Sequence, residues 1–319
     1  MTQRRSRSNL LSGRYIDRLA HWRKDEDLWR AALSDANTWF VPVWRNQNLV
    51  REVEGRIDAF MLSSSSLEIE SHIDEVVLLG EFQQHTCFAI SLTGETPPSF
   101  EEAVAPRDLR MIAGELPAEQ AGLLAYARAM IHWRERHRFC GRCGTPTQAV
   151  QGGHVRVCSN ASCAEQVFPR IDPAIIVLIT DGERALLGRQ ASWPPGRYST
   201  IAGFVEPGES LEDAVIREAA EETGVRIESV EYHSSQPWPF PSSLMLGFIA
   251  TAATTEIQLH DAELEDARWF TRAQIAAGEV ALPITHSISF RLVEDWYDDG
   301  AEIPLREQPG VRLWSRPSR

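Results

Sequence analysis

Residues 203–225 have the sequence GFVEPGESLEDAVIREAAEETGV, and the fold is inferred outward from this stretch. Ser210 with Asp213 three residues later forms a capping box, which predicts that a helix begins there. Aliphatic residues at helical spacing over 211–219 give this helix an apolar face. Gly224 predicts its end, because glycine takes the left-handed conformation of a helix C-cap without strain. We therefore expect a helix over Ser210–Glu222.

Three carboxylates lie along one side of this predicted helix. Glu218, Glu221 and Glu222 are spaced i, i+3 and i+4, so they share a face and repel one another. Arg217 is the only neighbouring cation in the sequence. Hard divalent cations prefer oxygen ligands, so Mg²⁺ or Mn²⁺ explains the cluster better than an ordinary solvated face. Such cations bridge a diphosphate and activate an attacking water. A surface acidic helix without metal is the alternative.

Strands are predicted on both sides of this helix. Ala174–Ile179 is apolar enough for a buried strand, and a second helix is predicted at Ile284–Tyr297. Further strands are predicted at Arg184–Gly188, Leu244–Thr251 and Ala267–Phe270. This mixture of strands and helices indicates an α/β or α+β domain.

Residues 1–138 carry no chemical motif. Strands are predicted at Thr38–Trp44, Glu75–Leu79 and Cys87–Ser91, and a helix with an apolar stripe is predicted near Pro117–His137. These elements indicate a mixed α/β domain. No internal repeat is evident along the chain.

Four of the five cysteines form two pairs between these regions. The spacing Cys140-x2-Cys143 and Cys158-x4-Cys163 can place four thiolates tetrahedrally around one Zn²⁺. Such a closed site leaves no open position, so the zinc is expected to be structural; buried free thiols are the alternative. Cys87 stands alone and is expected to be an inert core residue. The nearby histidines at 132, 137 and 154 are expected to stay outside the cysteine site.

Composition is that of a soluble globular protein. The 319 residues carry a net charge of −13, and 43% of them are hydrophobic. Such an acidic chain does not attract nucleic acid in bulk, so phosphates need a local device such as a metal ion. No apolar run reaches membrane-spanning length, and the basic N-terminus lacks the apolar stretch of a signal peptide. We expect a cytoplasmic protein of two or three domains with no membrane partner.

Residues 235–243, SQPWPFPSS, lie downstream of the glutamates. Alternating prolines fix φ and keep the segment extended, so its two aromatic rings are displayed at little entropic cost. Flat aromatic rings stack on adenine or nicotinamide, and polar neighbours orient the ligand. A purely structural proline-rich turn is the alternative. The residues expected to bind substrate are Gln236, Pro237, Trp238, Pro239, Phe240, Pro241 and Ser243.

The stretch 203–225 matches the Nudix box, G-x5-E-x7-R-E-U-x-E-E-x-G-U, at every fixed position, and so resembles the Nudix family. The resemblance implies an α/β/α sandwich preceded by a zinc ribbon and a mixed N-terminal domain, with boundaries 1–138, 139–168 and 169–319. It implies that Glu218 and Glu222 bind the metal and that Glu221 assists or acts on the water, with either Glu221 or Glu222 as base. The residues implied to hold the box together are Gly203, Glu209, Arg217 and Gly224.

The cysteine quartet followed by SQPWPFPxS is similar to the NADH pyrophosphatase subfamily. This resemblance implies hydrolysis of the diphosphate of NADH and NAD⁺, with NADH yielding reduced nicotinamide mononucleotide and AMP, by two or three Mg²⁺ or Mn²⁺ ions in a homodimer. For some members it also implies removal of NAD caps from RNA. Phe168 takes the place of a base-stacking aromatic, commonly Tyr. Ala202 is implied to offer its carbonyl to metal, Glu263 to add a carboxylate ligand, and Ser289 to contact substrate.

Several alternatives stay open from the sequence. Glu265 and Asp266 are neighbours that compete with Glu263 for the metal-ligand role. The basic tract 134–138 beside the ribbon would steer RNA if removal of NAD caps were the main task, although such a run is more often a solvated helix end. ADP-ribose and other dinucleotides are alternative substrates. The non-enzymatic alternative is a catalytically inactive Nudix and zinc-ribbon module that senses nucleotides or binds protein, which the intact glutamate set disfavours.

Overall fold

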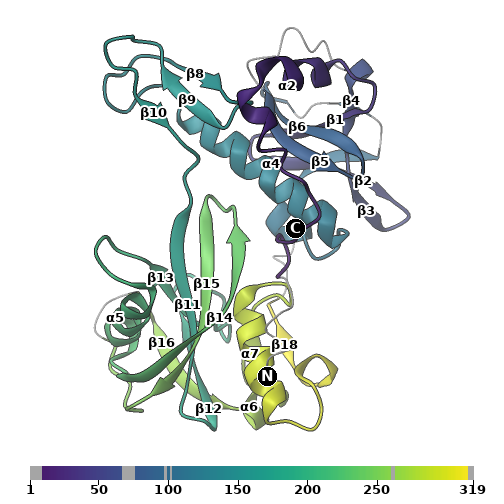
Figure 1. The fold of residues 1–319 in the computed structure, drawn as a ribbon. Coiled ribbons are helices and arrows are strands. Elements are labelled where there is room, and N and C mark those ends of the chain that lie inside the picture. Colours follow the sequence, from purple (N-terminus) through teal and green to yellow (C-terminus); the bar gives the residue numbers. More distant parts are fainter. Residues whose placement is uncertain (1–8, 67–75, 97–98, 101–102, 260–262, 315–319) are drawn as a thin grey trace. The chain divides into compact units, whose positions relative to one another are not determined.

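The computed structural model describes residues 9–66, 76–96, 99–100, 103–259 and 263–314 (Figure 1). The chain folds into two compact units. The N-terminal unit consists of Leu10–Ile171 and Trp238–Ser242, and the C-terminal unit consists of Met1–Asn9, Asp172–Pro237 and Ser243–Arg319. Each unit has a sheet and a buried core of its own.

The N-terminal unit is built on a seven-stranded sheet. Its strands are β1 (Thr38–Trp44), β2 (Gln47–Val53), β3 (Arg56–Ala59), β4 (Leu62–Ser63), β5 (Val76–Phe82), β6 (His85–Leu92) and β7 (Val104–Arg107). The order is β3-β2-β1-β6-β5, with β4 paired to β1 and β7 to β2. The central pair, β1 and β6, is parallel. The strand predicted at Thr38–Trp44 is confirmed with the same limits.

Helices cover both faces of this sheet. They are α2 (Glu26–Leu33), α3 (Leu109–Ile112) and α4 (Ala118–Arg136), with 3₁₀ turns η1 (Trp22–Lys24) and η2 (Ser64–Ser66). Val41 of β1 packs in one buried cluster with Leu124 of α4, and the neighbouring Phe40 packs in another with Leu33 of α2. Alternate side chains of a strand point to opposite faces, so the strand is buried on both sides. The predicted helix near Pro117–His137 is confirmed as α4.

A small antiparallel sheet of β8 (Thr147–Val150), β9 (Val155–Cys158) and β10 (Gln166–Val167) follows α4. The turn between β8 and β9 covers part of edge strand β5: Leu78 N donates to Gly152 O at 2.9 Å. His154 Nε2 donates to Leu78 O at 2.6 Å. Burial lowers the pKa of His154 to about 4, which keeps this ring neutral. His154 thus fastens the small sheet to β5.

The C-terminal unit is built on a six-stranded sheet of order β14-β15-β11-β12-β16, with β13 paired to β11. Strands β11 and β15 run parallel. The strands are β11 (Asp172–Thr180), β12 (Arg184–Arg189), β13 (Ile201–Phe204), β14 (Ile227–Trp238), β15 (Ser243–Ala252) and β16 (Asp266–Thr271). Two short strands, β17 (Ala281–Leu282) and β18 (Arg312–Leu313), pair separately.

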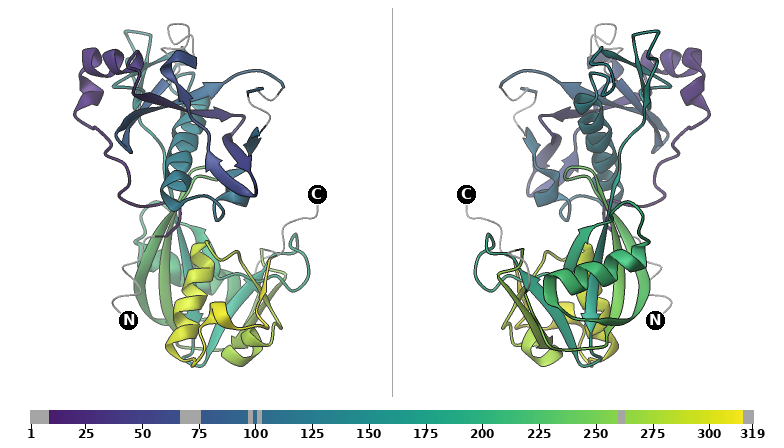
Figure 2. Two further views of the ribbon diagram at one scale, coloured as in Figure 1. Left: turned by 90° about the vertical axis from the view of Figure 1, so that its right-hand side faces the viewer. Right: turned by 90° about the vertical axis from the view of Figure 1, so that its left-hand side faces the viewer.

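Helices α5 (Leu211–Thr223) and α7 (Ile288–Asp299) lie on opposite faces of this sheet, as the two opposed views of Figure 2 show, while α6 (Arg272–Ala276) and η5 (Leu305–Glu307) are short. Val177 of β11 packs with α5, and its neighbour Leu178 packs with α7. The predicted α/β/α sandwich is confirmed. The C-terminal helix begins later than the predicted Ile284, because Ser287 caps its first turn. None of the described helices is long and apolar enough to cross a lipid bilayer.

Candidate active site

Helix α5 begins and ends where its sequence predicts. Ser210 Oγ accepts from Asp213 N at 3.1 Å, and Asp213 Oδ2 accepts from Ser210 N at 3.1 Å. Gly224 closes the helix at φ 71°. The predicted capping box and left-handed cap are both confirmed. Because these caps satisfy free backbone groups at both ends, they fix the helix that carries the three glutamates.

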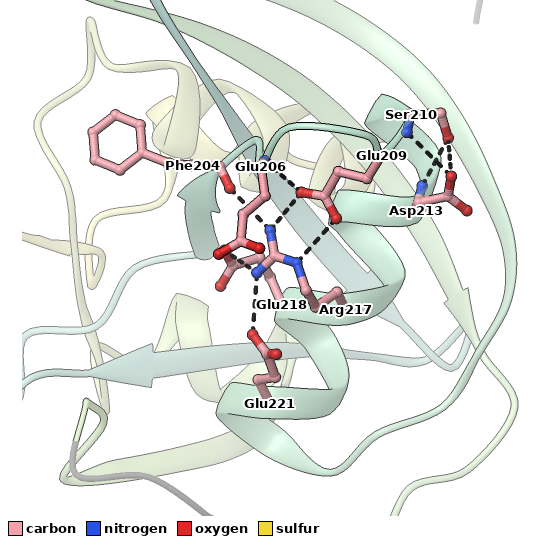
Figure 3. A network of polar contacts seen from close by, with 8 residues as sticks. All are labelled: Phe204, Glu206, Glu209, Ser210, Asp213, Arg217, Glu218 and Glu221. Atoms are coloured by element: carbon pink, nitrogen blue, oxygen red, sulfur yellow. Dashed lines mark hydrogen bonds and ion pairs between the residues drawn. The ribbon is translucent and has the colours of Figure 1, made fainter.

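Arg217 joins α5 to the loop that precedes it (Figure 3). Its Nε and Nη2 bind Glu209 Oε2 and Oε1 at 3.0 and 2.6 Å, and Nη2 also donates to Phe204 O at 2.9 Å. Its Nη1 donates to Glu218 Oε1 at 2.8 Å and to Glu221 Oε2 at 3.1 Å. Bonding to Arg217 lowers the pKa of Glu209 to about 2, so this carboxylate stays ionised. One guanidinium thus fixes both the loop and two of the glutamates.

The glutamates of α5 differ in burial. Glu218 and Glu222 are only 8% and 3% exposed, whereas the side chain of Glu221 is 55% exposed. Burial raises the pKa of Glu218 despite its contact with Arg217. Gly203 of β13 leaves room for the Glu218 carboxylate, because a Cβ at this position would collide with the carboxylate where it now lies. The absence of a side chain at this position of β13 therefore leaves space for the buried carboxylate.

Glu263, Glu265 and Asp266 were the three candidates for a further carboxylate ligand. The negative charge of Glu263 helps to raise the pKa of the Glu218 carboxyl. Glu265 instead forms an ion pair with Arg189. Asp266 accepts a hydrogen bond from Tyr198 and pairs with a neighbouring arginine. The electrostatics therefore favour Glu263 over its neighbours as a further ligand.

These oxygens are of the type that divalent cations prefer, although in the described part of the chain only the four cysteines already form a compact metal-binding group. Two buried carboxylates carry a desolvation cost that a bound cation offsets, and Arg217 supplies only one positive charge to the group. Ala202 directly precedes Gly203, the residue of β13 against which the Glu218 carboxylate packs. The predicted donor set for Mg²⁺ or Mn²⁺ stays Glu218, Glu222, Glu263 and the Ala202 carbonyl.

Two residues predicted to contact substrate are instead occupied inside the C-terminal unit. Gln236 is fully buried; its Nε2 donates to His286 O at 2.9 Å and its Oε1 accepts from Ile288 N at 2.8 Å. Ser289 Oγ accepts from Thr200 N at 3.2 Å. Both side chains connect α7 to its surroundings, and their contact with a ligand stays a prediction.

The aromatic residues of the SQPWPFPSS segment belong to the N-terminal unit. Trp238 and Phe240 meet edge to face, with ring centroids 5.1 Å apart and planes at 78°. Both side chains are half-buried, Pro239 is buried and Pro241 is exposed. Phe168, just after β10, is 59% exposed. The flanking Pro237 and Ser243 lie in the C-terminal unit and are half-buried.

The four predicted cysteines come together in space. The ligand atoms of Cys140, Cys143, Cys158 and Cys163 lie within 4.8 Å of one another. The Cys140–Cys163 and Cys143–Cys158 sulfur distances are 3.8 and 3.4 Å. Thiolates about 2.3 Å from a tetrahedral Zn²⁺ lie roughly 3.8 Å apart, so this set fits a closed structural zinc site.

Family models match three consecutive regions of the chain. Residues 170–289 match the NUDIX domain. Residues 135–168 match the NADH pyrophosphatase zinc ribbon domain, and residues 37–133 match the NADH pyrophosphatase-like rudimentary NUDIX domain. The NAD-capped RNA hydrolase NudC of Stutzerimonas stutzeri (strain A1501) is 39% identical over 269 residues, which are 83% of this chain and 93% of that protein. The chain belongs to the Nudix family.

Two further Nudix relatives extend the comparison. The NAD-capped RNA hydrolase NUDT12 of Macaca fascicularis is 44% identical over 57% of this chain, but the match covers only 43% of that longer protein. The human mitochondrial NAD(P)H pyrophosphatase NUDT13 is 36% identical over 71% of this chain and 72% of that protein. The resemblance to the NADH pyrophosphatase subfamily is thus confirmed.

The match of residues 37–133 explains an architecture that no motif indicated. In both units of this Nudix protein, a strand pairs in parallel with a strand much later in the chain: β1 with β6, and β11 with β15. Helix α5 lies between β13 and β14, whereas the described residues between β4 and β5 contain only η2. In its described part, the N-terminal unit thus retains the sheet without a glutamate helix.

Proposed function

We propose that this Nudix protein is a metal-dependent pyrophosphohydrolase that cleaves the diphosphate of NADH and NAD⁺, releasing AMP and the nicotinamide mononucleotide. The observation that carries this proposal is the buried Glu218–Glu222 pair on α5, held in place by Arg217 and admitted by Gly203. The names of the relatives support the substrate class. The intact glutamates argue against an inactive binding module.

Residues of the chain divide the work as follows. Two or three Mg²⁺ or Mn²⁺ ions would be held by the donor set above, where bound cations neutralise the diphosphate and make water a better nucleophile. Arg217 holds the acidic loop and helix in register. Glu222 or Glu221 would take the proton of the attacking water; Glu222 is the better placed, because Glu221 is largely exposed and bonded to Arg217.

The remaining parts of the site concern binding. Trp238, Phe240 and Phe168 would stack on the rings of the dinucleotide, in a segment kept extended by Pro237, Pro239 and Pro241. Ser243, Gln236 and Ser289 complete the proposed substrate set. The cysteine quartet would hold one structural Zn²⁺.

Three finer features also belong to the proposal. NAD caps on RNA would be a second substrate, as the names of two relatives suggest. The enzyme would act as a homodimer in the cytoplasm. Sedimentation and cell fractionation test these last two features.

A substrate panel with product identification tests the proposed function. NADH, NAD⁺, ADP-ribose and NAD-capped RNA are incubated with Mg²⁺ or Mn²⁺, and products are separated and identified by mass. In ¹⁸O-labelled water, the label should enter one product phosphate. Cleavage of capped RNA should weaken with salt much more than cleavage of NADH. Failure to release AMP from any dinucleotide with either cation refutes the proposal.

A further inference from the structure

The turn Trp238–Pro241, called here the aromatic turn, is bonded to a single arginine of α4. Arg128 Nη1 donates a hydrogen bond to Pro239 O, and Arg128 Nε donates to Asn46 O at 2.9 Å. The guanidinium carbon lies 4.8 Å from the centroid of the Phe240 ring. All of these residues belong to the N-terminal unit. One planar group therefore contacts both the backbone and a ring of the aromatic turn.

Arg128 is itself held in a fixed place. It is half-buried in the second half of α4, and Asn46 sits at φ 60° in the tight turn between β1 and β2. One turn further along α4, His132 Nδ1 lies 3.0 Å from Asn46 Oδ1, a hydrogen bond in the tautomer that protonates Nδ1. The guanidinium thus links the aromatic turn to a helix and a β-turn that are both parts of the folded core.

The position of the Arg128 guanidinium limits which face of the Phe240 ring is free to stack on a ligand. A cation over one face of the ring is attracted by its π electrons and covers that face. Phe240 in turn meets Trp238 edge to face. The half-exposed Trp238 is therefore the ring better placed to stack on a ligand, and Phe240 supports it from one side.

We propose that Arg128 is a positioning residue for dinucleotide binding: it fixes Phe240 and the Pro239 carbonyl so that Trp238 is already oriented when a substrate ring arrives. This inference rests on the proposed function. Preorganisation of this kind lowers the entropic cost of binding and leaves the chemical step unchanged.

Steady-state hydrolysis of NADH by variants at position 128 tests the inference. Arg128→Gln should raise KM about tenfold, as expected when two side chains must be ordered on binding, and should change kcat less than about threefold. Arg128→Lys keeps the charge and the stem but not the planar fork, so its KM should rise by a smaller factor. Arg136→Gln removes an exposed arginine from the same helix and should leave both constants unchanged.

A double-mutant cycle with Phe240→Leu separates positioning from general stability. If Arg128 acts through Phe240, the double variant should have about the same KM as the single variants, whereas independent effects would multiply. Wild-type KM in Arg128→Lys and Arg128→Gln, or multiplicative effects in the cycle, overturns the inference. If Arg128→Gln fails to fold, by its thermal unfolding midpoint, the Lys variant and its own cycle with Phe240→Leu decide. Wild-type protein that releases AMP from no dinucleotide with either cation would instead refute the proposed function.

Discussion

Replacing Gly203 by alanine should displace the Glu218 carboxylate while leaving the fold intact. A Cβ at position 203 would lie well inside 3.0 Å of the Glu218 carboxylate, closer than real Cβ atoms lie to other atoms. Gly203 is in a strand and does not have a positive φ, so the backbone accepts alanine. The Glu218 side chain is flexible and can rotate away, so the free energy of unfolding should change by only about 1 kcal/mol.

The effect on catalysis should be much larger. The carboxylate must move by about 1 Å or more to escape the new methyl group, and a displacement of that size at a reacting centre costs about a hundredfold in rate. We expect kcat/KM for NADH to fall by that factor at saturating Mg²⁺ or Mn²⁺, while the thermal unfolding midpoint falls by only about 2–4 °C. Glu218→Gln is the matched control, because adding Gly203→Ala to it should cost little more. Gly203→Ala with kcat/KM within about threefold of wild type would refute the proposed role of Glu218.

Three other changes test separate parts of the molecule. Glu222→Gln should fold and keep zinc but lose kcat by a factor of about 10²–10⁴, and near-normal turnover contradicts its role. Cys143→Ser should lose stoichiometric zinc by elemental analysis, and full retention of zinc would exclude this ligand. Burial lowers the pKa of His154 from 6.5 to about 4, so between these values the unfolded chain binds a proton that the native chain does not. The free energy of unfolding should therefore decrease as the pH is lowered from about 6.5 to about 4, by at most about 3 kcal/mol. Urea titrations of wild type and His154→Gln should differ in this slope, and identical pH dependence contradicts the assignment.

The helix of the Nudix box could be predicted almost to the residue because its determinants are local. Its caps, Ser210 and Gly224, and its apolar face all lie within one stretch of chain. The strand predicted at Ala174–Ile179 was found within β11 for a related reason. β11 packs against helices on both faces, so its sequence is a continuous apolar run.

Elements with weak local signals escaped prediction. Strand β14 (Ile227–Trp238) alternates poorly, since its first half is largely exposed, and the sequence predicts extended backbone only at its end near the prolines. The Nudix-like nature of residues 37–133 cannot be inferred from a short motif, because a shared sheet topology is set by strand order and pairing over the whole domain. The sequence therefore showed no repeat where the structure shows two related sheets.

The SQPWPFPSS segment shows that residue type alone does not predict the packing contacts of a side chain. The sequence predicts that Gln236 contacts a ligand, and the structure adds a role within the fold: Gln236 is fully buried and bonds the first turn of α7. That helix carries Ser289, whose hydroxyl bonds Thr200 just before β13. β13 in turn carries Gly203, against which Glu218 packs. The segment is therefore joined through successive contacts to the carboxylate that we assign to metal binding. This connection cannot be predicted from the sequence, because it depends on packing between distant parts of the chain.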